Sequence, residues 1–126
     1  MKRYLNILLI TVALSSFTAS SGIDEVIMAL RSGNVAQLSQ YFDNTIDITL
    51  PDKSNAYSKS QAEMVLRDFF MTNGVQRFDV IHKGENAGSQ YCIGTLVTRA
   101  GPYRTTVYMK QRGDKQVIQE IRLEKR

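Results

Sequence analysis

Two spacings of hydrophobic residues divide the chain into a helical part and a strand-rich part. Between residues 22 and 42 the apolar positions recur every three or four residues, the spacing of amphipathic helices. Gly33 interrupts the pattern, and Asn34 is a residue type that caps a following helix. Two short helices are therefore predicted, and their apolar positions are Ile23, Ile27 and Leu30 in the first and Val35, Leu38 and Phe42 in the second.

The spacing changes to two after the second helix. Ile46, Ile48 and Leu50 alternate with polar residues, a pattern typical of a strand that buries one face. Pro51 cannot continue a central strand, because it lacks a backbone N–H. We therefore expect a strand up to residue 50, followed by a polar loop over 51–57.

Residues 58–74 carry the clearest helix pattern in the chain. Ser58 and Gln61 have the spacing of a capping box, and Asn73-Gly74 supplies a left-handed stop. One face of this helix is apolar and consists of Ala62, Val65, Leu66 and Phe69.

The remainder of the chain is predicted to be strand. Glycine-containing turns at 84–88, 99–102 and 112–115 are short enough that consecutive strands must run antiparallel. The four expected strands are 75–83, 89–98, 103–111 and 116–123. The predicted order is thus helix, helix, strand, helix and four strands, an α+β fold.

Residues 1–20 have the pattern of a secretory signal peptide. A basic start, Met1-Lys2-Arg3, is followed by an apolar run over 5–14 and by small residues up to Ser20. The run is shorter than the roughly 20 residues that a membrane-spanning helix needs. A buried N-terminal helix is the alternative, which the basic start disfavours. We expect cleavage near Ser20, no membrane span thereafter, and one domain over 21–126 that is periplasmic or secreted.

The net charge is small. The whole chain carries 16 Lys or Arg against 12 Asp or Glu, and two of the basic residues belong to the signal segment. Nucleic-acid-binding domains present a strongly basic face. We therefore expect no nucleic-acid partner.

Four stretches of this sequence carry a resemblance to known proteins. The stretches "YFDNTIDITLP" and "SKSQAEMVLRDFF" look like the second-helix-to-first-strand passage and the third helix of the nuclear transport factor 2-like superfamily, whose curved sheet folds over its helices like a cone. The third-helix stretch, as "YSKSQAEMVLRDFF", also resembles, together with "HKGENAGSQYCIGTL" and "TRAGPYRTTVYMK", a family of small exported bacterial proteins of unknown function. The resemblance implies the cone fold over residues 22–124.

The resemblance also implies where an enzyme of this superfamily would hold its base. Ketosteroid isomerase and the polyketide cyclases place a carboxylate at the end of the first strand, where this chain has Leu50. Asp47 is expected on the opposite face of that strand, and Asp52 in the loop. Asp68 follows Arg67 on the third helix, and a surface ion pair between these two side chains is the simplest explanation for its presence. No catalytic residue is assigned.

Metal and cofactor chemistry find little support. One histidine and one cysteine cannot supply the four ligands of a closed metal site. A single cysteine also cannot form a bridge within the chain. We expect no metal and no cofactor.

The strand pairing decides which residues line the cone. The apolar pattern favours His82 opposite Tyr91 and Phe78 opposite Thr95. This register turns one set of residues inward as the predicted ligand pocket, namely His82, Tyr91, Tyr103, Phe69 and Phe70. Aromatic walls with a few polar groups suit a small apolar or peptide-like ligand. The alternative is that these side chains simply fill the core.

The same register turns a second set outward as the predicted dimer or partner face, namely Cys92, Leu96, Tyr108 and Ile118. An apolar stripe on a charged sheet suggests a partner surface, and a homodimer is expected. High strand propensity alone is the alternative explanation.

Three functions follow from these features. A non-catalytic binding module with a small-molecule or peptide ligand in the cone ranks first. A component of the cell envelope that binds proteins through its outer sheet face ranks second. An isomerase-like or dehydratase-like enzyme using His82 and a tyrosine ranks third.

Overall fold

The computed structural model describes residues 22–126 as three helices and one six-stranded sheet. The predicted signal segment, residues 1–20, lies outside the described residues. The helices are α1 (Gly22–Ser32), α2 (Val35–Ser39) and α3 (Lys59–Asn73). The strands are β1 (Phe42–Leu50), β2 (Lys53–Ser58), β3 (Val75–Asn86), β4 (Ser89–Thr98), β5 (Gly101–Arg112) and β6 (Lys115–Lys125).

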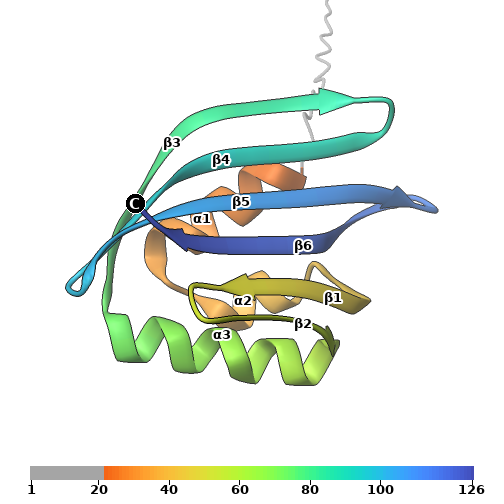
Figure 1. Cartoon of the computed structure of the whole chain (residues 1–126). Coiled ribbons are helices and arrows are strands. Elements are labelled where there is room, and N and C mark those ends of the chain that lie inside the picture. Colours follow the sequence, from red (N-terminus) through yellow and green to blue (C-terminus); the bar gives the residue numbers. More distant parts are fainter. Residues whose placement is uncertain (1–21) are drawn as a thin grey trace, which may run out of the picture.

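The sheet curves over the helices, which confirms the predicted α+β cone (Figure 1). Its strand order is β2-β1-β6-β5-β4-β3. All neighbouring strands run antiparallel except β1 and β6, which are parallel. None of the helices in residues 22–126 is long and apolar enough to cross a membrane.

Strand β2 corrects the prediction of a polar loop over 51–57. It pairs with β1 from Thr45 opposite Ser58 to Leu50 opposite Lys53, so Pro51 and Asp52 form the turn of a hairpin. All of its residues are exposed except Tyr57, which is half-buried. An edge strand without a buried face has no alternation of apolar residues for the sequence to reveal.

The core fills the space between the sheet and the helices. Burying each large apolar side chain there contributes roughly 1.5–3 kcal/mol. Its largest fully buried members are Phe78, Leu30, Leu38, Ile46, Ile48, Leu66, Leu96, Met109, Ile118, Ile121, Leu123 and Val26.

Both predicted ends of α3 are confirmed. Ser58 and Gln61 form the capping box, and Gly74 ends the helix with a φ of 72°. The positive φ favours glycine at this position, and a Cβ there would also displace the Arg99 guanidinium, whose Cζ would lie 2.3 Å away. The Arg99 N–H donates to the Gly74 carbonyl at 2.9 Å, which joins the β4–β5 turn to the end of α3.

The predicted register of β4 was wrong against both of its neighbours, by one residue at Phe78 and at Tyr103 and by two residues at His82. His82 lies opposite Ile93 rather than Tyr91, and Phe78 lies opposite Leu96. A bulge between Val80 and His82 adds one residue to β3. In the observed register, every second residue of β4 from Gln90 to Thr98 points inward and is buried.

The close approach of a ring explains this register. The ring of Phe78 lies over Gly94, where a Cβ would come within 2.6 Å of the ring and of the Asp79 carbonyl. The outward row of β4 contains Tyr91, Ile93 and Val97, whereas the inward row contains Cys92 and Leu96, so hydrophobic patterning alone favoured the wrong row. The glycine fixes which row faces the core.

Candidate ligand-binding site

Three of the predicted pocket residues lie on the inner side of the sheet. Phe69 and Phe70 from α3 are buried, as is Tyr103 from β5. The Tyr103 ring meets the Phe69 ring edge-on, with 5.0 Å between the centroids. These aromatic side chains pack in the core, as the alternative explanation had it.

His82 and Tyr91 do not face the interior, so this part of the prediction was wrong. Both lie on the outer side of the sheet, where the Tyr91 hydroxyl and His82 Nε2 share a hydrogen bond of 2.5 Å. The Tyr91 ring covers Gly84, the residue opposite it on β3. The two rings are neighbours, as predicted, but on the other face, because neither the bulge in β3 nor the one-residue shift of β4 was foreseen.

The predicted outer stripe was wrong for three of its four residues. Cys92, Leu96 and Ile118 are fully buried in the core, and only Tyr108, at 44% exposure, lies on the outer face. A bulge between Tyr108 and Met109 places Ile118 opposite Met109, on the inner side of the sheet. Burial raises the pKa of the Cys92 thiol to about 12, although nearby Lys83 lowers it in part.

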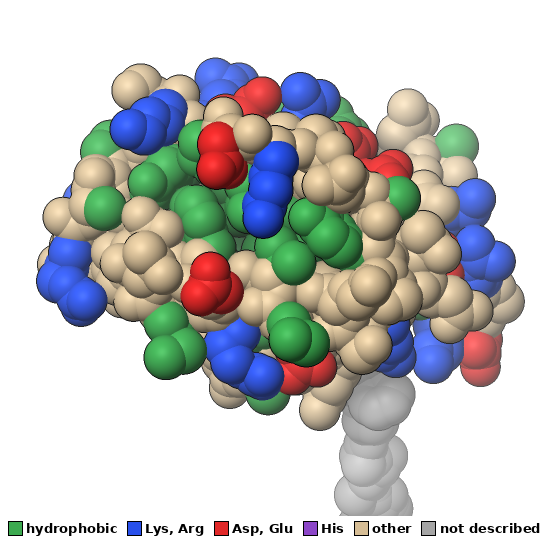
Figure 2. Space-filling model, turned by 60° about the horizontal axis from the view of Figure 1, so that its bottom comes forward, with side chains coloured by type: hydrophobic (Ala, Val, Ile, Leu, Met, Phe, Trp, Pro, Cys, Tyr) green, Lys and Arg blue, Asp and Glu red, His purple; other side chains and the backbone are tan. Residues whose placement is uncertain are grey.

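A pocket of about 390 Å³ lies between the β1–β2 hairpin and α3, and we call it the hairpin pocket. Its lining residues are Leu50, Asp52, Lys53, Met64, Val65, Asp68, Phe69, Thr72 and Asn73. Figure 2 shows hydrophobic side chains gathered in a hollow on this side of the molecule, with charged side chains at its margin. The pocket was not foreseen, because one wall depends on the unrecognised strand β2.

The floor of the hairpin pocket is apolar. Leu50 from β1 and Phe69 from α3 are each 9% exposed, and Val65 is half-buried beside them. Each comes from an element whose periodicity turns it toward the core. The floor is therefore the margin of the core, left uncovered where the hairpin and the helix diverge.

Asn73 holds one end of the pocket in place. Its side-chain amide donates to the Phe69 carbonyl at 2.8 Å, and its Oδ1 accepts a hydrogen bond from the Tyr103 hydroxyl at 3.0 Å. These bonds connect the last turn of α3 to the sheet.

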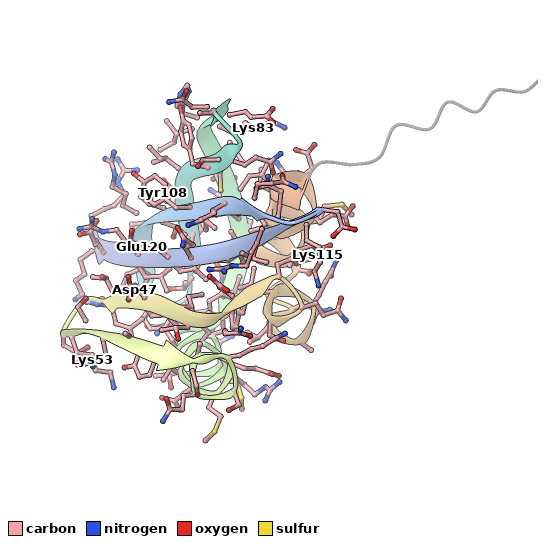
Figure 3. The ribbon with its side chains drawn as sticks, turned by 90° about the vertical axis from the view of Figure 1, so that its right-hand side faces the viewer. Asp47, Lys53, Lys83, Tyr108, Lys115 and Glu120 are labelled. Atoms are coloured by element: carbon pink, nitrogen blue, oxygen red, sulfur yellow. The ribbon has the colours of Figure 1, made fainter. Side chains whose placement is uncertain are left out.

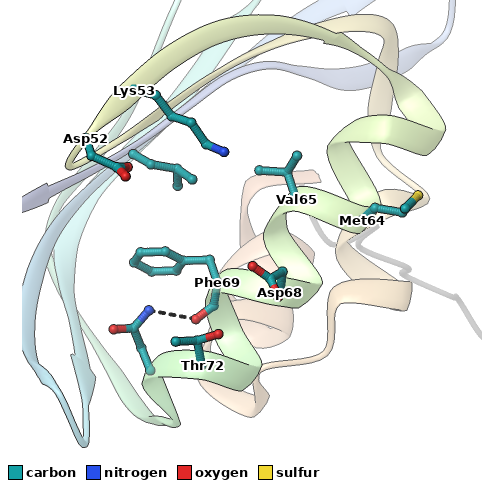
Figure 4. Close-up of a pocket in the computed structure, with 9 residues that line it drawn as sticks. Asp52, Lys53, Met64, Val65, Asp68, Phe69 and Thr72 are labelled. Carbon is teal, nitrogen blue, oxygen red and sulfur yellow. Dashed lines mark hydrogen bonds between the residues drawn. The ribbon is translucent and has the colours of Figure 1, made fainter.

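Three charged side chains surround the floor. Asp52 and Lys53 reach in from the hairpin turn, and Asp68 reaches in from α3 (Figure 4). Within residues 22–126 no hydrogen-bond or ion-pair partner is found for any of these three side chains. The expected pair between Asp68 and Arg67 is wrong, because Arg67 instead pairs with Glu63 at 2.6 Å.

Metal chemistry gains no support in the part of the chain that the structure describes. No group of three or more His, Cys, Asp or Glu side chains is placed there to hold an ion. The charges of the hairpin pocket thus surround an apolar floor rather than a ligand cage.

Sequence comparison places this chain in a family. The profile of a domain of unknown function, DUF4783, matches residues 23–124. The chain belongs to the DUF4783 family. A comparison with curated proteins found no relative.

Solved structures agree with this assignment. A DUF4783 protein from Bacteroides uniformis is 31% identical, with a TM-score of 0.81 over 84% of this chain and 98% of that one. Another, from Bacteroides ovatus, is 30% identical, with a TM-score of 0.78 over 81% and 93%. A nuclear transport factor 2-like protein of unknown function from Cytophaga hutchinsonii is 10% identical, with a TM-score of 0.58 over 80% and 83%. This last similarity concerns the fold alone, and it agrees with the expected cone fold.

Proposed function

We propose that this DUF4783 chain is an exported, non-catalytic binding module whose ligand occupies the hairpin pocket. The observation that carries the proposal is the apolar floor of Leu50, Val65 and Phe69, left open in a pocket of about 390 Å³. Small-molecule sites are concave, largely apolar, and about 300–1,000 Å³ in volume. The ligand site thus lies at the margin of the cone rather than deep inside it.

The identity of residue 50 supports binding rather than turnover. Enzymes of the superfamily that this fold resembles carry a carboxylate base at this point of the first strand. Leu50 supplies only apolar surface there, and its side chain forms part of the floor. A small apolar or peptide-like ligand can use that surface.

A fluorescent probe tests the pocket directly. N-phenyl-1-naphthylamine is neutral and apolar, and its emission rises when it leaves water. We expect saturable binding to the purified protein and a loss of at least tenfold in affinity in Val65→Trp, whose larger ring fills the pocket. Met71→Trp is the matched control, because Met71 is 73% exposed on the same helix and does not line this pocket. Equal affinity in the two variants would place the probe elsewhere.

A second candidate function is protein binding through the outer sheet face, with a second copy of the chain as partner. The observation that favours it is the exposed ring of Tyr108, whose centroid lies 6.4 Å from that of Tyr91. Glu120 and Asp47 continue the same row across β6 and β1 (Figure 3). This face therefore has an apolar part, formed by Tyr91 and Tyr108, beside a charged part, formed by Glu120 and Asp47. Protein interfaces commonly combine apolar and polar areas.

A further inference from the structure

Three exposed charged side chains, Asp52, Lys53 and Asp68, line the hairpin pocket around one apolar floor and have no partner within residues 22–126. Asp52 lies in the turn of the β1–β2 hairpin, and Lys53, the next residue, begins β2. Asp68 approaches from α3 on the opposite side, with the Phe69 ring between the two walls (Figure 4). The pocket therefore presents two negative groups and one positive group to whatever occupies it.

A ligand that covers the apolar floor also comes close to these three charged groups. An apolar molecule such as the naphthylamine can cover the floor, but wherever it also touches these side chains it removes water without replacing the lost hydrogen bonds, which lowers its affinity. A ligand with an ammonium and a carboxylate of its own would replace them with charge-assisted bonds. A simple cation could form ion pairs with Asp52 and Asp68 but would be repelled by Lys53.

We infer that the ligand is an amphipathic zwitterion, that is, an apolar amino acid or a short apolar peptide with free ends. Its ammonium group lies between Asp52 and Asp68, its carboxylate meets Lys53, and its apolar side chain covers Leu50, Val65 and Phe69. This inference rests on the proposed function, and it specifies the chemical class of the ligand.

The dipeptide Leu-Leu and its blocked forms test the inference. Titration calorimetry at low salt compares Leu-Leu with N-acetyl-Leu-Leu, with Leu-Leu-amide, and with the doubly blocked peptide. We expect Leu-Leu to bind, and each single block to weaken binding about tenfold. Exposed charge pairs are screened by salt, so the effect of each block should shrink as the ionic strength rises.

Variants assign each end of the peptide to its partner. Asp68→Asn and Asp52→Asn should remove most of the penalty of N-acetylation, whereas Lys53→Gln should remove that of amidation. Asp114→Asn and Lys115→Gln in the β5–β6 turn are matched controls, because both residues are exposed and neither lines the hairpin pocket. The controls should leave all affinities unchanged.

The outcomes separate the inference from the proposed function. If the doubly blocked peptide binds as tightly as Leu-Leu, or if only the neutral naphthylamine binds, the zwitterion inference is overturned while the pocket remains a binding site. If the naphthylamine also fails to bind, or binds equally to Val65→Trp, the proposed function itself is overturned.

Discussion

The hydroxyl of Tyr103 on β5 donates a 3.0 Å hydrogen bond to Oδ1 of Asn73, the last residue of α3. This bond spans the cone and fixes the end of the helix that forms one wall of the hairpin pocket. Tyr103 is only 6% exposed, so water cannot readily take the place of its partner.

Removing this bond should loosen the helix end. Tyr103→Phe leaves Asn73 Oδ1 without its donor, and we expect the free energy of unfolding to fall by about 1 kcal/mol. Urea denaturation measures this change. Tyr108→Phe is the control, because Tyr108 is exposed, and its stability should remain within about 0.5 kcal/mol of that of the parent protein. Equal losses in the two variants would mean that the Tyr103 bond adds nothing.

The ion pair between Arg112 and Asp43 should contribute more than an exposed one. Arg112 donates to Asp43 Oδ2 at 3.0 Å, and the Asp43 side chain is only 9% exposed. Arg112→Gln leaves this buried carboxylate without its charged partner, so we expect a loss of about 1–3 kcal/mol in the free energy of unfolding. Arg122→Gln is the matched control, because Arg122 and its partner Glu124 are both more than 40% exposed. A loss in Arg122→Gln as large as that in Arg112→Gln would contradict this account.

Cys92 should be chemically silent in the folded protein. Its side chain is fully buried, and burial raises its pKa from 9.0 to about 12, so little thiolate forms at neutral pH. We expect no alkylation by iodoacetamide in buffer and complete alkylation in urea. Rapid modification of the native protein would show that the thiol is accessible and would restore the outward register for β4.

The same shift predicts how stability depends on alkaline pH. Between about pH 9 and pH 12 the unfolded chain loses the Cys92 proton while the folded chain keeps it, so the free energy of unfolding should fall by up to about 1.4 kcal/mol per pH unit. The pKa of Tyr41 is also raised, first by burial and then by Glu25, and acts in the same direction at higher pH. Cys92→Ala should be less stable at pH 7 and should show a shallower decline. Parallel curves for the two proteins would contradict the assignment to Cys92.

The outer sheet face makes a separate prediction about assembly. If a second copy covers Tyr108 and Tyr91, Tyr108→Glu should shift the molar mass in light scattering from dimer to monomer, with unchanged circular dichroism. Ile81→Glu tests whether the edge strand β3 also takes part in this interface, because Ile81 is 61% exposed. An unchanged mass in Tyr108→Glu would remove the basis of the second candidate function.

The sequence was sufficient for the fold because the strongest local patterns are also the structural boundaries. The capping box at Ser58 and the left-handed stop at Gly74 delimit α3 as predicted. The alternation of Ile46, Ile48 and Leu50 likewise marks the buried face of β1. These features depend on residues close together in the chain.

The site was harder to predict because it depends on single-residue irregularities. One extra residue at Ile81 moves His82 to the outer face, a one-residue shift of β4 turns Tyr91 outward, and an irregularity near Tyr108 brings Ile118 inward. Two-residue turns replace the longer turns that were expected, as at Ala87 and Gly88, whose φ angles are both positive. Alternation has a period of two, so each such change reverses a whole face.

The most direct test of the hairpin pocket is to locate a bound probe by NMR. In ¹⁵N–¹H spectra recorded with increasing N-phenyl-1-naphthylamine, we expect the largest shifts at the backbone amides of Lys53, Val65, Asp68 and Phe69. The amides of Tyr91 and Tyr108 on the outer face should stay unchanged. Shifts confined to the outer face, or saturation without any shift around α3 and the β1–β2 hairpin, would contradict the proposal that this pocket is the binding site.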